Sequence, residues 1–357
     1  MRFSKSYFDD IRYFDEPYKR YLLVIFILAL FLLPWMLKLS TYIIFVLSLI
    51  FVYSIVTVGL NILMGYTGQV SLGHAAFMAI GAYSLVNLIS KAGLPFVLAL
   101  PASGLIAGLL GVIVGPSALR IKGLYLALVT MCFGFIVDVV ILEWPDMTNG
   151  SEGMLVPYAS IGSLELDTDL EKYFLILTVA IIMLVIAKNL IRSRLGRAFV
   201  AIRDSDIAAE TMGIDLAKYK IIAFGVSAFY AGIAGGLLAP LLGFIGPDNF
   251  SLFDSIAYLI MVVVGGMGSI LGSIMGAAFM TLLPEVIRLF KDYFPDVLSD
   301  QKGIQAILYG LILILFIRFE PNGLYGRWLH IKYFWETFPL GKQMKTKKLI
   351  VSGGRRI

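Results

Sequence analysis

Long apolar runs recur along the whole chain and constrain its fold more than any other feature. Ten of them approach the roughly 20 residues that a helix needs to cross the hydrocarbon core of a bilayer. They occupy residues 21–37, 41–63, 74–90, 94–115, 123–144, 173–190, 221–243, 255–267, 269–290 and 303–319. A spanning segment must satisfy its own backbone hydrogen bonds, and these runs lack the alternation of a barrel strand. The sequence therefore predicts an all-α, polytopic membrane helix bundle of about ten spans.

The composition agrees with a lipid bilayer as the main surroundings of the chain. Of the 357 residues, 59% are hydrophobic and 15% are charged, and the mean hydropathy is +0.88. A soluble domain carries about 25% charged residues. These values exclude an ordinary soluble domain, and they also exclude a disordered or fibrous chain.

Charge gathers in particular segments between the runs, which predicts their side of the membrane. Residues 188–220 carry seven Lys or Arg, residues 318–357 carry nine against two acids, and residues 145–172 carry six acids and one lysine. Ten spans with both termini in the cytoplasm would place the basic segments inside and the acidic one outside. The predicted layout is a cytoplasmic segment over 1–20, a transmembrane domain over 21–319 with an external loop over 145–172 and a cytoplasmic loop over 188–220, and a basic cytoplasmic tail over 320–357.

Residues with the chemistry for catalysis are scarce in this sequence. The two histidines, His74 and His330, are far apart, and neither a Gly-x-Ser-x-Gly elbow nor a phosphate-binding loop occurs. We therefore expect no catalytic residue, no metal site and no cofactor in this chain. The net charge of +5 lies mostly in the tail, so it fits a membrane flank, and no nucleic-acid partner is expected.

Two glycine-interrupted stretches predict broken or re-entrant helices. One reads Gly65-Tyr-Thr-Gly68-Gln-Val-Ser71-Leu-Gly73-His74 and the other reads Gly265-Gly266-Met-Gly268. Both follow a Ser-Ile pair at nearly the same distance, so they are either parts of an internal repeat or two independent breaks. Broken helices at corresponding places in two halves of a chain are a sequence pointer to a transport site. The candidates for a translocation path are Gly65, Gly68, Ser71, Gly73, His74, Gly265, Gly266 and Gly268.

The first break has two interpretations. Ser71 could cap a half-helix that starts near Leu72, and the free backbone N–H groups of that helix would favour a carboxylate. In the plainer alternative, His74 is a hydrogen-bonded packing residue.

Few ionisable side chains lie within the predicted spans, and each is a functional candidate by default. Asp138 joins the candidate path because it has no simple interfacial explanation. Glu143 beside Trp144 fits an interfacial position, and Glu285 with Arg288 is either a local ion pair or part of a substrate site. So few carboxylates at membrane depth give a proton or sodium relay little to work with.

The cytoplasmic loop contains the pattern of a short helix. Asp204 or Ser205 can cap its start, and Gly213 can end it. Ile207, Thr211 and Ile214 would share one face. Such a helix is either a surface helix that rests on the bundle or a docking helix for a cytoplasmic partner.

Four segments together resemble one known family. Residues 61–77, 123–131, 196–204 and 257–272 are similar, in the same order, to the LivM-type permease subunit of branched-chain amino-acid ABC importers, and the resemblance extends over roughly residues 20–325. It implies a transport subunit in a bacterial or archaeal cytoplasmic membrane. The implied partners are a second, LivH-like permease, two cytoplasmic ATP-binding subunits that hold ATP and Mg, an external substrate-binding protein and an amino-acid substrate.

The resemblance also implies which residues couple the chain to the ATPases. The Ala-Ala-x-x-x-Gly core of the family's coupling segment maps onto Ala208, Ala209 and Gly213, whereas Ile207 stands where the broader importer pattern has glutamate. The implied coupling residues are Asp206, Ile207, Ala208, Ala209, Glu210 and Gly213. The alternatives are a permease for urea or short amides in the same transporter class, and a stand-alone secondary transporter.

Overall fold

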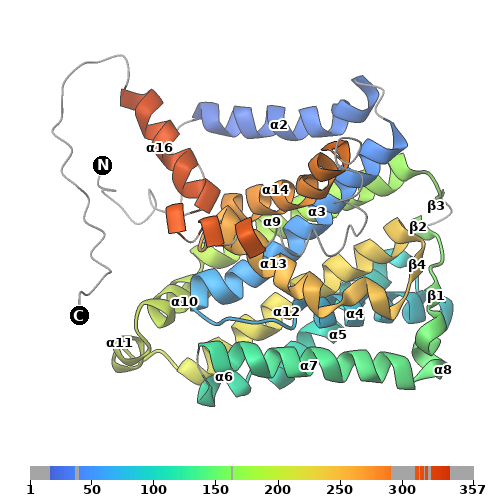
Figure 1. Ribbon diagram of the computed structural model, residues 1–357, viewed down its shortest axis with the longest axis horizontal. Coiled ribbons are helices and arrows are strands. Elements are labelled where there is room, and N and C mark those ends of the chain that lie inside the picture. The colour runs from blue at the N-terminus through green and yellow to red at the C-terminus, as the bar shows by residue number, and fades with distance from the viewer. Residues whose placement is uncertain are drawn as a thin grey trace.

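The computed structural model describes residues 17–36, 40–121, 123–161, 164–290, 310–312, 314–316, 318–320 and 323–337, and helices dominate it (Figure 1). They are α2 (Pro17–Met36), α3 (Thr41–Asn61) continued by the π-helical turn η1 (Ile62–Tyr66), α4 (His74–Ser90), α5 (Phe96–Val114), α6 (Ser117–Arg120), α7 (Leu124–Glu143), α8 (Pro145–Thr148), α9 (Asp169–Arg192), α10 (Arg194–Asp204), α11 (Asp206–Thr211), α12 (Leu216–Leu242), α13 (Leu252–Gly265), α14 (Ile270–Phe290) and α16 (Gly323–Thr337). The short 3₁₀ helices η2 (Gly150–Glu152) and η3 (Pro247–Phe250) lie in loops. The prediction of an all-α membrane bundle is confirmed.

Six helices of the described residues are long and apolar enough to cross a membrane. They are Thr41–Tyr66, Phe96–Arg120, Leu124–Glu143, Asp169–Arg192, Leu216–Leu242 and Pro247–Gly265, and the shorter apolar helices His74–Ser90 and Ile270–Val286 accompany them. Each of these eight coincides with one of the predicted runs, and α2 coincides with the run at 21–37. The run at 303–319 falls largely outside the described residues.

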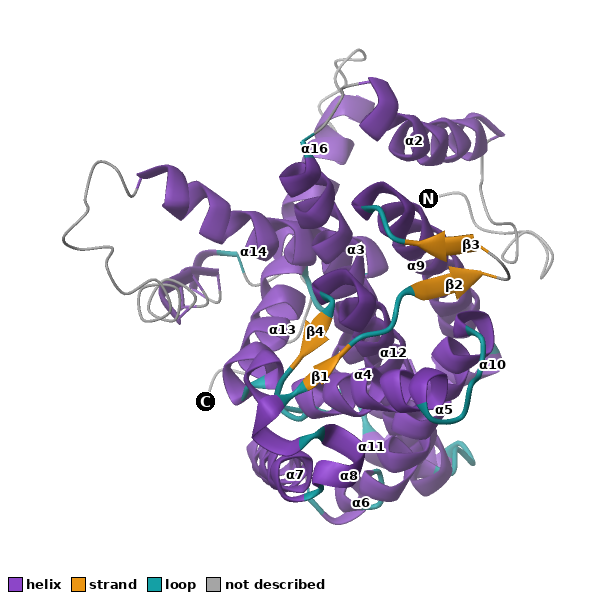
Figure 2. Ribbon diagram, turned by 90° about the vertical axis from the view of Figure 1, so that its right-hand side faces the viewer, coloured by secondary structure: helices purple, strands orange, loops and turns teal. Residues whose placement is uncertain are grey.

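The core of the bundle is α12, which packs against α3, α4 and α5 (Figures 1 and 2). Glycines make this close approach possible: a methyl group on Gly81 of α4 would overlap the carbonyl oxygen of Gly232 of α12. Gly111 of α5 likewise faces Ala228 of α12. In lipid, helices associate through such packing because no hydrophobic force drives them together. The small-residue spacings of the sequence thus mark the tightest helix contacts.

The segment between α7 and α9 is a cap at one end of the bundle. It contributes to two short antiparallel ladders: its strand β1 (Met154–Leu155) pairs with β4 (Phe244–Ile245), which lies outside the segment, and its strands β2 (Ala159–Ile161) and β3 (Leu164–Leu166) pair with each other. The registers join Met154 to Ile245 and Ala159 to Leu166. Since β4 follows α12 directly, the first ladder fixes this cap to the end of the central helix.

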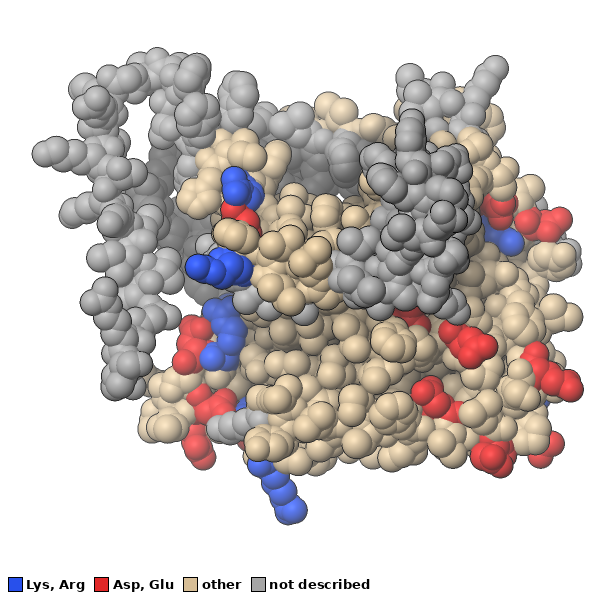
Figure 3. Space-filling view, in the orientation of Figure 1, with Lys and Arg blue, Asp and Glu red and all other residues tan. Residues whose placement is uncertain are grey.

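Charge divides between the two ends of the bundle (Figure 3). On the face shown, Lys and Arg gather, together with some acids, at the end where Figure 1 places α10 and α11. The opposite end, which holds α8 and the strands, is mainly acidic. The segments that the charge pattern assigns to opposite sides of a membrane therefore lie at opposite ends of the fold.

Candidate functional site

The two predicted helix breaks meet in space, although about 200 residues separate them. A Cβ atom on Gly65 would overlap the backbone nitrogen of Gly268. The Asn61 side chain joins the breaks, because its Oδ1 accepts from the N–H of Gly268 at 2.8 Å and its Nδ2 donates to the carbonyl of Ser269 at 2.9 Å. The same Nδ2 donates to Ser273 Oγ at 2.7 Å. Asn61 and Ser273 escaped the sequence analysis, although a buried asparagine in an apolar run is a signal that could have revealed the first.

The first break is an extended segment between η1 and α4. In Figure 1 the chain runs from the end of α3 back toward the middle of the bundle before α4 begins. Gly68 there has a left-handed backbone with φ of 71°. The Leu72 N–H donates to Thr130 Oγ1 of α7 at 2.9 Å, which holds the segment against a third helix.

The predicted cap at Ser71 is wrong in detail. The helix starts at His74 with Gly73 as its N-cap, two residues later than expected, and no side chain caps it. The Ser71 hydroxyl instead accepts from the N–H of Gly73 at 3.3 Å. One of the helix's first N–H groups, that of Ala75, donates to Ser255 Oγ of α13 at 2.9 Å. The Ser255 side chain of a neighbouring helix therefore satisfies an N–H group that was predicted to be free for a carboxylate.

His74 is fully buried and bonded on both ring nitrogens. Ser227 Oγ of α12 donates to the Gly59 carbonyl at 2.7 Å, so it must accept at the 2.7 Å contact with His74 Nε2. Nε2 therefore carries the proton, an assignment that rests on this network. Nδ1 is then the acceptor for Ser71 Oγ at 3.2 Å. This arrangement favours the packing interpretation of His74, which ties α3, α4 and α12 together.

Asp138 lies close to the point where the first break ends and α4 begins. It is half-buried on α7 and lines a small cavity together with Leu72, Ala75 and Ser255. The cavity measures about 10 Å³, which is room for about one water molecule. The structure thus brings Asp138 to the path predicted from the breaks, but an amino acid does not fit there in this arrangement.

The second break lies between α13 and α14. Gly266 and Gly268 both have positive φ angles, of 120° and 76°. A Cβ on Gly265 would overlap the Gly272 carbonyl, so the two helices pack closely at the break. Gly323, the first residue of α16, sits against the Val264 carbonyl and the Gly266 nitrogen. The Arg288 side chain lies outside the described residues, so the pair that it was expected to form with Glu285 stays a prediction.

The loop helix forms as predicted. It is α11, with Ser205 as its N-cap, whose hydroxyl accepts from the Ala208 N–H at 3.3 Å. Gly213 follows it with a φ of 82°. Ala209 is buried, whereas Ile207 is 77% exposed and Met212, just after the helix, is 85% exposed. Two large apolar side chains are therefore exposed at the basic end of the bundle.

Two cationic side chains connect the loop to the bundle. Arg203, at the end of α10, donates from Nη1 to the Gly65 carbonyl at 3.0 Å, and its stem lies beside Gly68. Lys220 of α12 pairs with Asp206 of α11 at 3.1 Å. Arg203 also pairs with Asp204 at 3.0 Å. In the sequence these cations indicate only the side of the membrane, and no local pattern predicts either contact.

Comparison with known proteins shows the family of the chain. A sequence model described as "Branched-chain amino acid transport system / permease component" matches residues 42–317. The high-affinity branched-chain amino acid transport system permease protein LivM of Escherichia coli K12 is 31% identical over 326 residues, which cover 84% of this chain and 74% of the relative. BraD of Pseudomonas aeruginosa, a permease protein of the same description, is 26% identical over 77% of this chain and 92% of its own length.

An archaeal relative extends the match. The probable branched-chain amino acid transport permease protein LivH of Methanocaldococcus jannaschii is 23% identical over 76% of this chain and 88% of its own length. No solved structure matches the chain. Because the family match spans most of the sequence and the LivM alignment covers most of both proteins, the chain belongs to the permease family of branched-chain amino-acid transport systems, whose members are transport subunits rather than enzymes.

Proposed function

We propose that this chain is one of two permease subunits of an ATP-driven importer for branched-chain or related neutral amino acids. Its partners are a second, LivH-like permease, two cytoplasmic ATP-binding subunits that hold ATP and Mg, and an external substrate-binding protein. The names of the relatives support the substrate class. The chain crosses a bacterial or archaeal cytoplasmic membrane ten times with both termini inside, because this count puts the basic end of the bundle in the cytoplasm.

The observation that carries the proposal is the position of α11. Ile207 in α11 and Met212 just after it both expose apolar side chains at the basic end, and we call this pair the apolar knob. Exposed apolar side chains on a short polar loop are typical of a site that a partner covers. We assign this knob to the ATPase. Asp206 and Arg203 stand directly behind it and pair with the central helix and with the first break.

Coupling then follows from contact. When the ATPases close on ATP they displace α11, and the Arg203 and Lys220 contacts transmit the displacement to Gly65 and α12. Because Gly65 packs on Gly268, both breaks shift together. The cavity at Asp138 is too small for an amino acid in this state, so passage requires that the helices separate or that the partner permease completes the path.

The test is reconstitution of the permease pair with its ATPases and binding protein in vesicles. We expect uptake of labelled leucine that requires ATP and is competed by alanine less strongly than by isoleucine and not by urea. Uptake by this chain without ATPases would indicate a stand-alone secondary transporter. Competition by urea would indicate the short-amide alternative.

A matched pair of variants tests the knob. Ile207→Glu should lower ATP-driven uptake by about tenfold or more and release the ATPases during purification, because a charge replaces an apolar anchor. Leu155→Glu introduces the same change at an equally exposed apolar position, 81% exposed, at the opposite end of the bundle, and should retain the ATPases. Retention of the ATPases by Ile207→Glu would contradict the docking role.

A further inference from the structure

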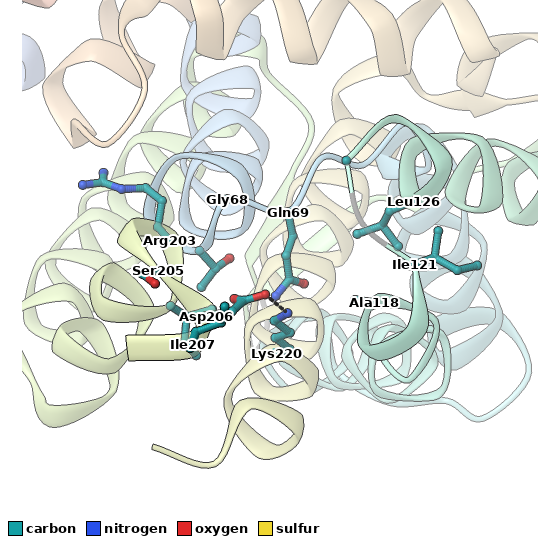
Figure 4. Close-up of a pocket in the computed structure, with 13 residues that line it drawn as sticks. Gly68, Gln69, Ala118, Ile121, Leu126, Arg203, Ser205, Asp206, Ile207 and Lys220 are labelled. Carbon is teal, nitrogen blue, oxygen red and sulfur yellow. Dashed lines mark hydrogen bonds and ion pairs between the residues drawn. The ribbon is translucent and has the colours of Figure 1, made fainter. Parts of the chain in front are cut away.

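A cavity separates α11 from the transmembrane helices at the basic end of the bundle (Figure 4). It measures about 370 Å³ and lies between the first break, the turn from α6 to α7, and the junction of α10 with α11. Pockets that bind small molecules start at about 300 Å³. The cavity is thus large enough for a small organic ligand, unlike the one beside Asp138.

Gln69 gives this cavity an unusual polar feature. Its residue surface is 5% exposed, and neither its Oε1 nor its Nε2 has a hydrogen-bond partner within the part of the chain that the structure describes. Figure 4 shows its side chain running into the cavity toward Lys220 and Asp206. A buried amide without partners costs about 1–3 kcal/mol, so such groups normally face a ligand or water.

The remaining walls supply three charged side chains, those of Lys220, Asp206 and Arg203, and an apolar surface. The Arg203 guanidinium points away from Gln69 and donates to the Gly65 carbonyl. Lys220 Nζ and Asp206 Oδ2 are 3.1 Å apart, and their side chains are only 6% and 20% exposed. Ala118, Ile121 and Leu126 form the apolar side. The cavity therefore combines an ammonium, a carboxylate, an amide that can donate and accept, and a hydrocarbon wall.

This combination is complementary to a free α-amino acid with an apolar side chain. The two Gln69 amide atoms are covered in this arrangement, and a rotation of the side chain exposes them to the cavity. The ligand's carboxylate can then accept from Lys220 and from Gln69 Nε2, and its ammonium can donate to Asp206 and to Gln69 Oε1. Its side chain then faces Leu126 and its neighbours. A phosphate or a simple carboxylate would satisfy Lys220 but would meet the like charge of Asp206.

We propose that this cavity is an inner-side binding site for apolar α-amino acids and that its occupancy inhibits transport. The proposal rests on the proposed function, since it assumes that the basic end faces the cytoplasm. A ligand there touches both α11, through Asp206, and the first break, through Gln69. The bound ligand stabilises the present arrangement of α11 and the first break by RT ln(1 + [L]/Kd). It therefore opposes the displacement of α11 that drives the transport cycle. Amino acid that has accumulated in the cytoplasm would then slow its own import.

The test uses the complete transporter in vesicles with the ATPases facing the bath and with binding protein and leucine in the lumen. L-leucine added to the bath should inhibit ATP hydrolysis in a saturable way. Leucine amide lacks the carboxylate and 4-methylpentanoate lacks the ammonium, so each should inhibit at least about tenfold more weakly, as the loss of one charged contact of about 1.4 kcal/mol implies. Equal inhibition by either analogue would overturn the zwitterion assignment.

The variant Gln69→Leu tests the site itself. Its inhibition constant for L-leucine, measured against its own uninhibited rate, should rise by about tenfold. Asn189→Leu removes an amide at the end of α9, outside the cavity lining, and should leave the constant unchanged.

Calorimetric titration of the purified complex with L-leucine, without binding protein, gives a readout that does not depend on transport. Absence of binding to the unmodified complex, or an unchanged constant in Gln69→Leu, would show that the cavity holds water only and overturn the proposal. Failure of ATP-driven uptake with binding intact would instead count against the proposed function.

Discussion

The centre of the bundle and the meeting point of the two breaks are held by different forces. At the centre, α4 and α12 touch backbone to backbone, with Gly81 on Gly232 and Gly235 on the Met78 carbonyl. At the breaks, Gly65 also approaches Gly268 closely, but side-chain hydrogen bonds add to this contact, from Asn61 to the second break and from Arg203 to the first. The packing of α4 on α12 allows only one arrangement, because any shift of one helix along the other creates voids or overlaps.

Hydrogen bonds between polar groups can instead be exchanged for others when helices slide. The breaks also contain backbone that is not helical, which tolerates changes in φ and ψ at little cost. We therefore expect the α4–α5–α12 core to move as a rigid body and the breaks to change shape. Substitutions in the core and at the breaks should therefore have different effects.

The largest effect is expected in the core. Gly81→Ala places a methyl group against the Gly232 carbonyl, which cannot move without shifting α12, and should lower the free energy of unfolding by about 3 kcal/mol. Gly134→Ala makes the same change on α7, where none of the described residues lies within 4 Å of the added carbon, and should be neutral or slightly stabilising. Thermal unfolding in detergent compares them. Equal melting temperatures would mean that α4 and α12 are not in backbone contact.

A smaller effect is expected where the breaks meet. Asn61→Leu removes three hydrogen bonds to the second break. Hydrogen bonds between membrane helices average about 0.6 kcal/mol each, so the loss should be about 2 kcal/mol. Asn87→Leu is the control, because among the described residues this amide bonds to the Tyr83 and Met147 carbonyls, near the C-terminal end of α4 and away from both breaks. It should cost less in the same assay, and a reversed order would contradict the assignment of Asn61 as the bridge.

Arg203→Met should spare the fold and damage coupling. It keeps the apolar stem beside Gly68 but removes the charged bond to the Gly65 carbonyl. A loss of about 1.4 kcal/mol of coupling would lower the amount of substrate moved per ATP by about tenfold. Arg197→Met, on the same helix, removes a bond to the nearby Arg192 carbonyl, the one side-chain bond of Arg197 among the described residues, and is the matched control. An unchanged transport-to-ATP ratio in Arg203→Met would exclude this contact as the link.

The features of the fold that depend on local sequence could be predicted. Apolar length located the candidate membrane spans that the structure describes, and α4 has the bounds of its run, because local length and backbone satisfaction decide a span. The helices α10 and α16 lie outside the predicted runs. Ser205 and Gly213 were predictable as the cap and the end of α11 for the same local reason. Glycine clusters located both breaks.

Interactions between distant segments were not predictable. Asn61 and Ser269 are 208 positions apart, and Arg203 and Gly65 are 138 apart, so no spacing rule connects them. The expected cap at Ser71 failed because Gly73 and His74 claim its hydroxyl and Ser255 satisfies the Ala75 N–H. Gln69 gave no signal either, because a lone glutamine in a glycine-rich stretch is ordinary until its neighbours are known.

The smallest effect is expected at the relay that fixes His74. Ser227→Ala removes the hydroxyl that joins the Gly59 carbonyl to Nε2, and should cost about 1 kcal/mol because two buried groups lose a partner while the glycine contacts around them persist. Thr178→Val, which removes a hydroxyl bonded within its own helix α9 to the Phe174 carbonyl, should leave the melting temperature unchanged. If Ser227→Ala instead destabilised the protein as much as Gly81→Ala, polar bonds rather than backbone packing would dominate the core, and the division between a rigid centre and exchangeable breaks would not hold.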